Sequence, residues 1–485
     1  MEINGFEYIP KEQRKNILLL SDDLRLSSGV GTVSRTFVMG TAHRYNWFQL
    51  GAAVQHPEIG KRIDISQDLN NRLGIPDSSV IIQPNNGYGD PDLIRALLRE
   101  RKFDAILHFT DPRQWVWLYN MEHELRQNIP IFFYHVWDNL PYPMYNKPYY
   151  LSCDWIGCIS KQTENIVKTV TDKKLKDWQI TYIPHGIDKT VFVPLSKENP
   201  GKMREDANKN IITDYELCQL NKKSILSKIN KSSDDIDFIV LYNNRNIRRK
   251  NMGDVILAFK EFCDKLPAEK SKRCLLIMHT NAVDPNGTDL PAVINALAKD
   301  YNILIHEEKV DPETLNHLYN IADVTINLAS AEGFGLATAE SLMAGTPIIA
   351  TVTGGLQDQM GFKDNDGNYI KFTKEWGTNS DGRFKNTHGK WVYPLFPTGR
   401  SLVGSPPTPY IFDDRVTWEE AANGLKYWYD KTREERKECG KAGREFMLQE
   451  EIAMEASHMC KRFMTDMETA WNNWTPRKRY KLIKL

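Results

Sequence analysis

The sequence lacks a charge excess, a long apolar run and a paired cysteine motif. Its 485 residues include 63 Lys plus Arg and 63 Asp plus Glu, so the formal net charge is zero. Such a balance gives no global electrostatic basis for binding nucleic acid or an anionic membrane. No run approaches the roughly 18 apolar residues that span a bilayer, so we expect no transmembrane segment.

The cysteines and the amino-terminal residues indicate a compartment. Seven cysteines form an odd set without a C-x-x-C pair, which favours a reducing environment. Residues 1–7, M-E-I-N-G-F-E, lack the basic and apolar segments of a secretory signal. We therefore expect a cytoplasmic protein.

Short apolar runs rich in β-formers alternate with helical patterns along the chain. This rhythm predicts parallel α/β units, and the length suffices for two or three domains. Helices are predicted between the strands, as at Met252–Leu266 and Pro312–Ile321. Two amphipathic helices close the chain, at Val416–Lys431 and Arg433–Thr469, and the second breaks near Gln449. The predicted strands are Asn16–Ser21, Ala105–Phe109, Pro130–Val136, Trp155–Ser160, Gln179–Ile183, Asp237–Tyr242, Cys274–His279, Asn302–His306, Asp323–Leu328 and Thr346–Thr351.

Two stretches fall outside this rhythm. The Lys-rich segment 197–231 is polar and shows no clear strand, so we predict a linker or an inserted helical hairpin. The segment 361–414 is irregular and rich in Gly, Asn, Pro and aromatic residues. A loop of this length inside a domain is usually functional or disordered, and the aromatic content argues against disorder.

Two glutamates separated by seven residues mark the most informative segment. The string E-G-F-G-L-A-T-A-E runs from Glu332 to Glu340 and is followed by S-L-M-A-G-T-P-I-I-A. Its glycine turn opens a helical stretch, so Glu332 should lie at the helix mouth and Glu340 about two turns inside. Such a helix start suits a phosphate, and carboxylates accept hydrogen bonds from sugar and ribose hydroxyls. These groups together suit a nucleotide-sugar.

This string resembles the E-x7-E motif of retaining glycosyltransferases with the GT-B fold, most closely the family 4 glycosyltransferases. The resemblance implies an α/β protein with two Rossmann-like domains that face each other across a cleft. It also implies that Glu332 contacts the hydroxyls of the donor sugar and that Glu340 contacts the ribose. The intervening residues that it places at the donor are Gly333, Phe334, Gly335 and Leu336.

The resemblance also divides the chain. Residues 1–195 would form an amino-terminal acceptor domain, and 196–234 a linker or insertion. Residues 235–452 would form the nucleotide-sugar donor domain, with the inserted region 361–414. Residues 453–485 would form a helix and a basic tail that return to the first domain.

A run of basic residues follows the predicted strand Asp237–Tyr242. It resembles the R-x4-K clamp of the family, with Arg245 and Lys250 neutralising the diphosphate of the donor. Because such cations can stabilise the leaving group, the resemblance implies that no metal or other cofactor is required. The family often has glycine where this chain has Asn244 and Asn251. Arg248 and Arg249, on the same run, are expected to be surface residues.

The first predicted strand is followed by a glycine-rich loop. Gly29 and Gly31 form a G-x-G, and glycines allow backbone N–H groups to approach an anion closely. The third glycine of a dinucleotide fingerprint is missing. The loop resembles the one that GT-B enzymes bring to the donor phosphates or to the acceptor.

Polar residues follow two further strands, where the crevice of an open α/β sheet lies. His135 resembles the family histidine that touches the donor sugar, although a lone His is often structural. Trp137, Asp138, Asp111 and Arg113 are acceptor-side candidates. Either aspartate suits the role of acceptor base, and a strand-end cap is an equally good interpretation of both.

The sequence therefore predicts a retaining glycosyltransferase that uses a nucleotide-diphosphate sugar. The acceptor is open, and a hydroxymethylated base in DNA and a glycan are both candidates. Cations beside aromatic rings would suit a nucleic acid strand. The alternatives are a nucleotide-sugar epimerase, and a non-catalytic sugar or nucleic-acid binding protein on a GT-B scaffold; the pyridoxal-binding lysine motif of a phosphorylase is absent. The cations considered for DNA are Arg383, Lys385, Lys390, Arg400 and the basic tail 477–484.

Overall fold

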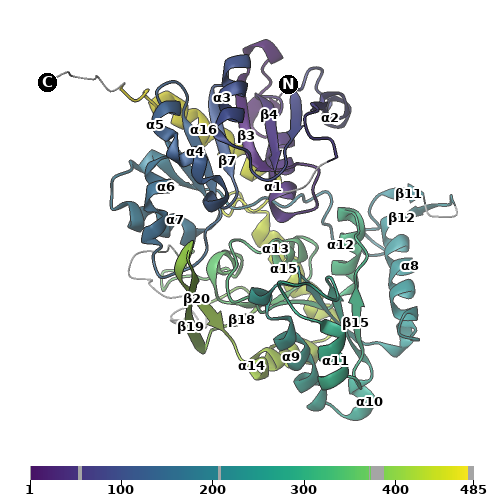
Figure 1. The fold of residues 1–485 in the computed structure, drawn as a ribbon. Helices are drawn as coiled ribbons and strands as arrows, with labels where there is room; N and C mark the ends of the chain where they lie inside the picture. Colours follow the sequence, from purple (N-terminus) through teal and green to yellow (C-terminus); the bar gives the residue numbers. More distant parts are fainter. Residues whose placement is uncertain (1, 53–56, 206–208, 371, 373–386, 479–485) are drawn as a thin grey trace. The chain divides into compact units, whose positions relative to one another are not determined.

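The chain forms two compact units in the computed structural model (Figure 1). The structure describes residues 2–52, 57–205, 209–370, 372 and 387–478. Unit 1 comprises Met1–Gly186, Gly404–Tyr410 and Ala453–Leu485. Unit 2 comprises Ile187–Val403 and Ile411–Ile452. The division after Gly186 precedes the boundary that we expected at residue 195.

The sheet of unit 1 is built on β3 (Lys15–Asp22), whose Ile17–Leu20 side chains are fully buried. The strand order is β10-β9-β8-β7-β3-β4-β6-β5, and the β5–β6 pair alone is antiparallel among the described pairings of this sheet. From β3 the chain adds β4, β5 and β6 on one side of this strand and then β7 to β10 on the other side. The direction in which strands are added therefore reverses between β3 and β7. The other strands are β4 (Tyr45–Ala52), β5 (Ile63–Asp64), β6 (Val80–Pro84), β7 (Ala105–Phe109), β8 (Ile131–His135), β9 (Trp155–Cys158) and β10 (Ile180–Tyr182).

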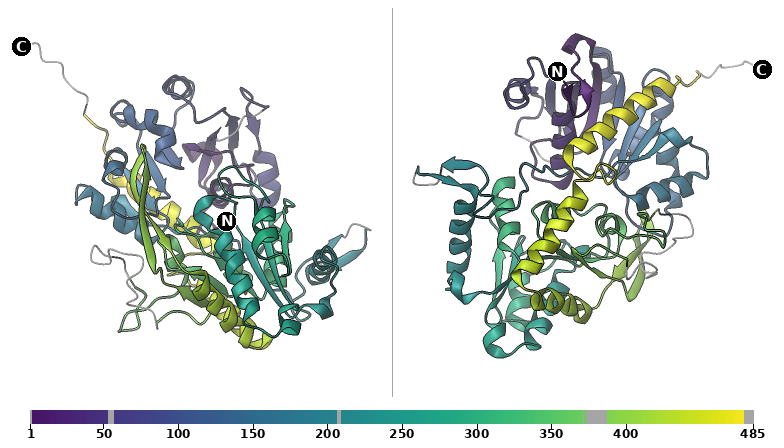
Figure 2. Two further views of the ribbon diagram at one scale, coloured as in Figure 1. Left: turned by 60° about the horizontal axis from the view of Figure 1, so that its bottom comes forward. Right: turned by 180° about the vertical axis from the view of Figure 1, so that it is seen from behind.

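The helix α16 (Ala456–Asn473) completes unit 1 from the far end of the chain. Its Phe463 stacks on Phe37 of α1, with ring centroids 4.9 Å apart, and Trp471 meets Phe132 of β8 at 5.3 Å. Figure 2 shows α16 lying across these strands in its right-hand view. The expected return of the last helix to the first domain is confirmed. The remaining α-helices of unit 1 are α1 (Gly29–Thr41), α2 (Ser66–Leu73), α3 (Pro91–Glu100), α4 (Val116–Asn120), α5 (Glu122–Leu125), α6 (Lys147–Leu151) and α7 (Lys161–Thr171).

The main sheet of unit 2 is wholly parallel, in the order β15-β14-β13-β16-β17-β18. Its first strand, β13 (Phe238–Asn243), lies inside the sheet, and the order reverses between β13 and β16. A parallel sheet covered on both faces needs continuous apolar strands, and the V-L-Y run of β13 is fully buried. The other strands are β14 (Cys274–His279), β15 (Ile303–His306), β16 (Val324–Asn327), β17 (Ile348–Thr351) and β18 (Val392–Leu395).

The helices of unit 2 pack a core of mostly aliphatic side chains with a few large rings. Phe259 and Phe262 of α9 and Trp428 of α14 are fully buried in it. Removing such apolar surface from water is the main favourable contribution to folding of this core. The α-helices are α8 (Asp214–Ser227), α9 (Met252–Asp264), α10 (Ala268–Ser271), α11 (Leu290–Leu297), α12 (Pro312–Ile321), α13 (Leu336–Met343), α14 (Trp418–Asp430) and α15 (Arg433–Met447).

All ten predicted strands are present, each within two residues of its predicted ends. The closing helices also match the expectation, because α15 ends at Met447 and α16 begins only at Ala456. Sequence reasoning missed β4 and β6. In β4 a buried polar residue interrupts the apolar pattern: Gln49 accepts a hydrogen bond from the Leu24 N–H at 3.0 Å and donates to the Asp22 carbonyl at 2.7 Å.

Two expectations about irregular segments are wrong. The segment 197–231 contains the short strands β11 (Met203–Glu205) and β12 (Ile211–Thr213) and the helix α8. The segment 361–414 contains β18 and a hairpin, β19 (Gly399–Ser405) with β20 (Thr408–Arg415). β11 with β12 and β19 with β20 form short two-stranded pairs, whereas β18 joins the main sheet beside β17. Short strands of this kind are poorly detected by single-sequence periodicity. Residues 371 and 373–386 of that region lie outside the described residues.

Gly440 of α15 allows this helix to lie against the turn after α13. A Cβ on Gly440 would lie 1.8 Å from the Gly345 carbonyl oxygen, which is backbone. We expect Gly440→Ala to lower the free energy of unfolding of unit 2 by about 1–3 kcal/mol or more, because the helix must shift. A Cβ on Gly253 of α9 would meet nothing within 4 Å, so Gly253→Ala should stabilise by up to about 1 kcal/mol. Urea unfolding of both variants checks this, and equal effects would contradict it.

Candidate functional site

The chain reversal in unit 2 brings two charged loops together. One loop follows β13 and carries Lys250, and the other follows β16 and carries Glu332. Because parallel strands end at one sheet edge, neighbouring strands on either side of a reversal form a crevice there. The Lys250 ammonium forms an ion pair with the Glu332 carboxylate. Arg249 joins them, with Nη1 3.2 Å from Glu332 Oε2 and donating to the Ala331 carbonyl at 2.5 Å.

This ion pair is largely removed from solvent. The Lys250 side chain is 6% exposed and that of Glu332 is 13% exposed. Burial raises the pKa of the Glu332 carboxyl, but Lys250 and Arg249 outweigh burial and hold the pKa below its usual value. The carboxylate is therefore ionised at neutral pH and remains available as an acceptor of hydrogen bonds.

Glycines shape the loop between the two motif glutamates. Gly335 has φ +91° at the start of α13, a conformation that side chains rarely adopt. A Cβ on Gly355 would lie 2.1 Å from the Gly333 carbonyl oxygen, and the Gly355 N–H donates to the Glu332 carbonyl at 2.8 Å. Phe334 is buried beneath this loop. The first N–H groups of α13, beginning at Leu336, follow directly and suit an anion.

Glu340 lies inside α13 in a different environment. It is 9% exposed, and its Oε2 accepts a hydrogen bond from the Tyr319 hydroxyl at 2.7 Å. Tyr319, on α12, in turn accepts a hydrogen bond from the Asn243 side-chain amide at 2.8 Å. Burial raises the pKa of the Glu340 carboxyl to about 7, against a smaller lowering by Tyr319. Glu340 thus titrates near neutral pH.

Arg245 and Arg248, the other basic residues of the clamp loop between β13 and α9, contact partners other than Glu332. Arg245 points outward, with 64% of its side chain exposed and Nε 3.2 Å from Asp284. Arg248 is 74% exposed and pairs with Asp413 at 3.4 Å, so it is the surface residue that we expected. Asn251 has φ +51°, and its side chain donates to the Leu328 carbonyl at 2.8 Å. Glycine adopts this left-handed conformation most readily, and Asn is one of the few other residues that tolerate it.

In unit 1 the glycine-rich loop leads into α1, as predicted. Ser28 caps this helix by accepting a hydrogen bond from the Gly31 N–H at 3.0 Å, and its hydroxyl donates to Asp22. A Cβ on Gly31 would lie 2.7 Å from the Leu26 carbonyl oxygen. Gly29 is the first residue of α1. The glycines therefore serve a tight strand-to-helix turn at the reversal of the unit 1 sheet.

His135 ends β8 as predicted, but it is fully buried in unit 1. Its Nε2 contacts the Tyr150 hydroxyl at 2.8 Å, and its Nδ1 has no partner among the described residues. Burial first, and then the charges of His108 and Arg113, lower the pKa of His135 well below its usual value. The ring is neutral at physiological pH, which suits a hydrogen-bonding role and excludes that of a cation.

The acceptor-side candidates of unit 1 gather around one guanidinium. Arg113 lies over the Trp137 ring, 4.6 Å from its centroid, and its Nε donates to Asp111 at 2.8 Å. The Asp111 carboxylate also accepts a hydrogen bond from the Arg113 backbone N–H at 3.0 Å. Asp111 therefore caps the end of the strand, which was one of the two interpretations of this residue. The Asp138 carbonyl accepts from the Gln162 side chain at 2.5 Å. Asp111, held by this ion pair, is poorly placed to act as a base.

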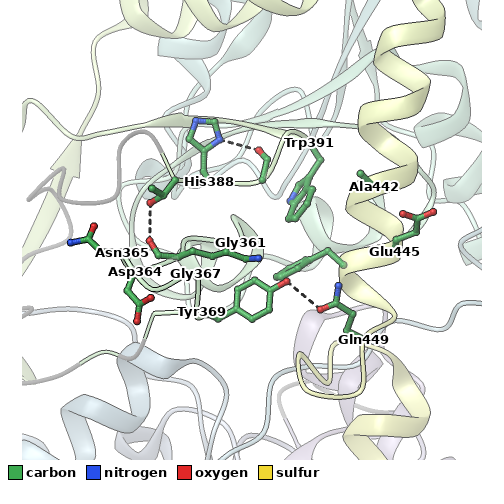
Figure 3. A pocket seen from close by; sticks show the side chains of 14 residues that line it. Gly361, Asp364, Asn365, Gly367, Tyr369, His388, Trp391, Ala442, Glu445 and Gln449 are labelled. Atoms are coloured by element: carbon green, nitrogen blue, oxygen red, sulfur yellow. Dashed lines mark hydrogen bonds between the residues drawn. The ribbon is translucent and has the colours of Figure 1, made fainter.

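A separate hollow of about 560 Å³ lies elsewhere in unit 2 (Figure 3). Trp391 stacks on Phe446 of α15 at its floor, with centroids 4.8 Å apart, and the Tyr369 hydroxyl donates to Gln449 at 3.2 Å. Trp391 immediately precedes β18, and its indole N–H donates to the Gln359 carbonyl at 2.9 Å. None of its lining residues belongs to the predicted site.

Neither metal ligands nor membrane spans are found in the described part of the chain. Across residues 2–52, 57–205, 209–370, 372 and 387–478, no group of three or more His, Cys, Asp or Glu side chains is placed to hold a metal ion. Over the same ranges no helix has the length and apolar character that crossing a membrane requires.

Part of the chain resembles proteins of a known family. Residues 224–376, which include the clamp loop and both motif glutamates, match the family model described as "Glycosyl transferases group 1". This part of the chain is therefore similar to the glycosyl transferases of group 1. A curated relative, the D-inositol 3-phosphate glycosyltransferase of Acidothermus cellulolyticus, is 32% identical over 123 residues. That match covers 24% of this chain and 27% of the relative, so it spans about a quarter of the relative's length.

Solved structures resemble this chain over nearly its whole length. HepE of Anabaena, solved with UDP and glucose, matches with a TM-score of 0.60 at 11% identity, over 94% of this chain and 100% of that one. Sucrose-phosphate synthase of Thermosynechococcus elongatus matches with a TM-score of 0.61 at 15% identity, over 95% and 100%. At such identities the likeness establishes the fold, and the expected GT-B class is confirmed.

Sequence reasoning missed three residues of the unit 2 site. Arg249 was expected at the surface, yet it contacts Glu332. Tyr319 donates to Glu340, and Asn243 donates to Tyr319, from elements that come together only in the fold. The Asn243 position, at the end of a predicted strand, was the one signal available beforehand.

We expect Lys250→Met to lower the free energy of unfolding of unit 2 by about 3 kcal/mol, because Glu332 would lose its buried counter-charge. The folded pKa of Glu332 lies below its ordinary value of 4.5. The ion pair therefore stabilises the folded state fully above pH 4.5, and this contribution is lost as the pH falls through the folded pKa. Urea unfolding between pH 4 and 8 measures the difference. Adding Glu332→Gln should restore most of the loss, and an unrestored double variant would refute the pairing.

Proposed function

We propose that the protein is a retaining glycosyltransferase that moves a sugar from a nucleotide-diphosphate sugar to an acceptor hydroxyl. The observation that supports this best is the buried Lys250–Glu332 ion pair at the chain reversal of unit 2. It combines a fixed cation, a fixed carboxylate and a helix start within one loop cluster. A nucleotide-diphosphate sugar offers the complementary groups, which are phosphates and hydroxyls.

Each group of the unit 2 site has a part in this proposal. Arg245 and Lys250 neutralise the diphosphate, together with the N–H groups at the start of α13. Glu332 accepts hydrogen bonds from the sugar hydroxyls, and Glu340 accepts them from the ribose. HepE of Anabaena, solved with UDP and glucose, is a protein of the same fold with such ligands.

The reaction breaks the bond between the anomeric carbon and the diphosphate oxygen. The acceptor oxygen bonds to the anomeric carbon on the same face, and its proton passes to the departing phosphate oxygen. Arg245 and Lys250 stabilise the negative charge that develops on the diphosphate, which is where transition-state stabilisation is most effective. Because these side chains supply the positive charge, we expect transfer to continue in the presence of EDTA.

We propose that the acceptor binds to unit 1. Arg113 and Trp137 present a cation and a ring there. His135, with a neutral imidazole, keeps the donor-sugar role expected of it. The case for a DNA acceptor is weaker in the structure, because Arg400 is held by Asp414 at 2.7 Å. Residues Arg383 and Lys385, and 479–484 of the basic tail, lie outside the described residues.

The two exposed arginines of the clamp loop make a matched pair of variants. We expect Arg245→Ala to weaken binding of the preferred nucleoside diphosphate roughly 10- to 100-fold, because one phosphate cation is lost. Arg248→Ala removes an equally exposed cation from the same loop and should change affinity less than about twofold. Calorimetric titration with UDP, GDP and ADP measures both. Equal losses in the two variants would mean that only general charge attracts the nucleotide.

Transfer itself is tested with the nucleotide that binds, supplied as its sugar donor. Hydroxymethylated DNA and simple glycosides serve as acceptors, and the anomeric configuration of the product is read by NMR. Retention supports the proposal, and inversion refutes the mechanism. Conversion of the donor to its epimer without an acceptor would favour the epimerase. Binding without any turnover on either acceptor class would favour a binding protein.

A further inference from the structure

Three elements of unit 2 meet at one phenol that neither motif contains. Tyr319 of α12 is fully buried, and its hydroxyl lies 2.7 Å from Oε2 of Glu340 and 2.8 Å from the Asn243 side-chain amide. Its backbone is fixed as well, because the Thr346 hydroxyl donates to the Tyr319 carbonyl at 2.7 Å. The hydroxyl therefore occupies one defined position between β13 and α13.

The direction of these hydrogen bonds is determined by their chemistry. An amide N–H can only donate, so Asn243 uses a lone pair of the Tyr319 oxygen. The single hydroxyl hydrogen of Tyr319 then points to Glu340 Oε2. In the described part of the chain no group donates to the other oxygen, Oε1. One carboxylate oxygen is thus anchored, and the other keeps its lone pairs for a ligand hydroxyl.

We propose that Tyr319, held by Asn243, is a positioning residue that fixes Glu340 as an ionised acceptor for the vicinal hydroxyls of a ribonucleotide. The inference rests on the proposed donor site. It adds that the site distinguishes ribose from deoxyribose through the orientation of Oε1. A carboxylate free to rotate would accept hydroxyl hydrogens with less geometric preference.

The electrostatics of the pocket agree with this role. Burial is the main influence on Glu340 and raises its pKa to about 7, whereas the Tyr319 hydroxyl lowers it by hydrogen bonding to the ionised form. Tyr319 itself is kept protonated, since burial and then Glu340 raise its pKa well above the usual value. Among the described residues no cation faces Glu340, in contrast to Glu332. Loss of the phenol hydroxyl would leave the carboxyl protonated at neutral pH.

The test compares UDP binding by the wild type and Tyr319→Phe between pH 6 and 9. We expect the variant to bind about fivefold more weakly at pH 7 and to recover at pH 9, because its Glu340 ionises roughly one unit higher than the wild-type value of about 7. The affinity ratio at each pH cancels the ionisation of the UDP phosphate itself. The wild type should prefer UDP to 2′-deoxy-UDP, and the variant should lose most of that preference at pH 7.

Two further variants keep the outcomes distinct. Asn243→Ala leaves the phenol without its fixing donor and should give a smaller change in the same direction. Tyr45→Phe, in unit 1, removes a buried hydroxyl that has no partner among the described residues and should leave UDP binding unchanged. A loss in Tyr319→Phe that is equal at every pH, with the deoxy preference intact, would make Tyr319 structural only and overturn the inference. If the wild type binds no nucleoside diphosphate, the proposed function fails and this inference with it.

Discussion

The reversal of strand order between β13 and β16 is the constraint on which the unit 2 site depends. Parallel strands deliver their following loops to one edge, and only at a reversal do the loops of two neighbouring strands turn to opposite sides and leave room between them. This geometry brings Lys250 to Glu332 across more than eighty positions of sequence. No local propensity of either loop could do so. The same reversal occurs in unit 1 between β3 and β7, where the glycine-rich loop and Asp111 follow.

The buried charges of this site are stabilised by charges of opposite sign and not by water. A buried ammonium or carboxylate alone costs several kcal/mol, so Lys250 and Glu332 each require the other. Arg249 adds a second cation and also binds the Ala331 carbonyl, which holds the loop as well as the charge. The glycines complete this arrangement, since Gly355 can approach the Gly333 carbonyl only without a side chain. Binding chemistry and folding thus place the same demands on these loops.

The sequence predicted the strands of both sheets that are apolar throughout, because uninterrupted burial leaves a strong pattern. It did not predict β4, whose buried Gln49 is satisfied by partners far along the chain, nor the paired strands within 361–414. At the site, the motif residues were found by their spacing. Arg249 was misjudged, since a charge run does not reveal which side chain turns inward. The role of Tyr319 could not be predicted from the sequence, because its contact with Glu340 depends on the packing of α12 against α13. The roles of Arg113 and Trp137 toward an acceptor, and of His135 toward the donor sugar, stay predictions.

The two motif glutamates show why spacing alone cannot assign chemistry. Glu332 and Glu340 are the same residue type on one short segment, yet their pKa values move in opposite directions, Glu332 below its usual value and Glu340 to about 7. The difference follows from their partners, which are two cations in the first case and a neutral phenol in the second. Environments that push paired carboxyls apart in this way assign them different roles. A carboxylate that is always ionised suits a charged reaction centre, where its charge is balanced. One that ionises only near neutral pH suits the neutral hydroxyls of a ribose, whose binding then helps to hold the charge.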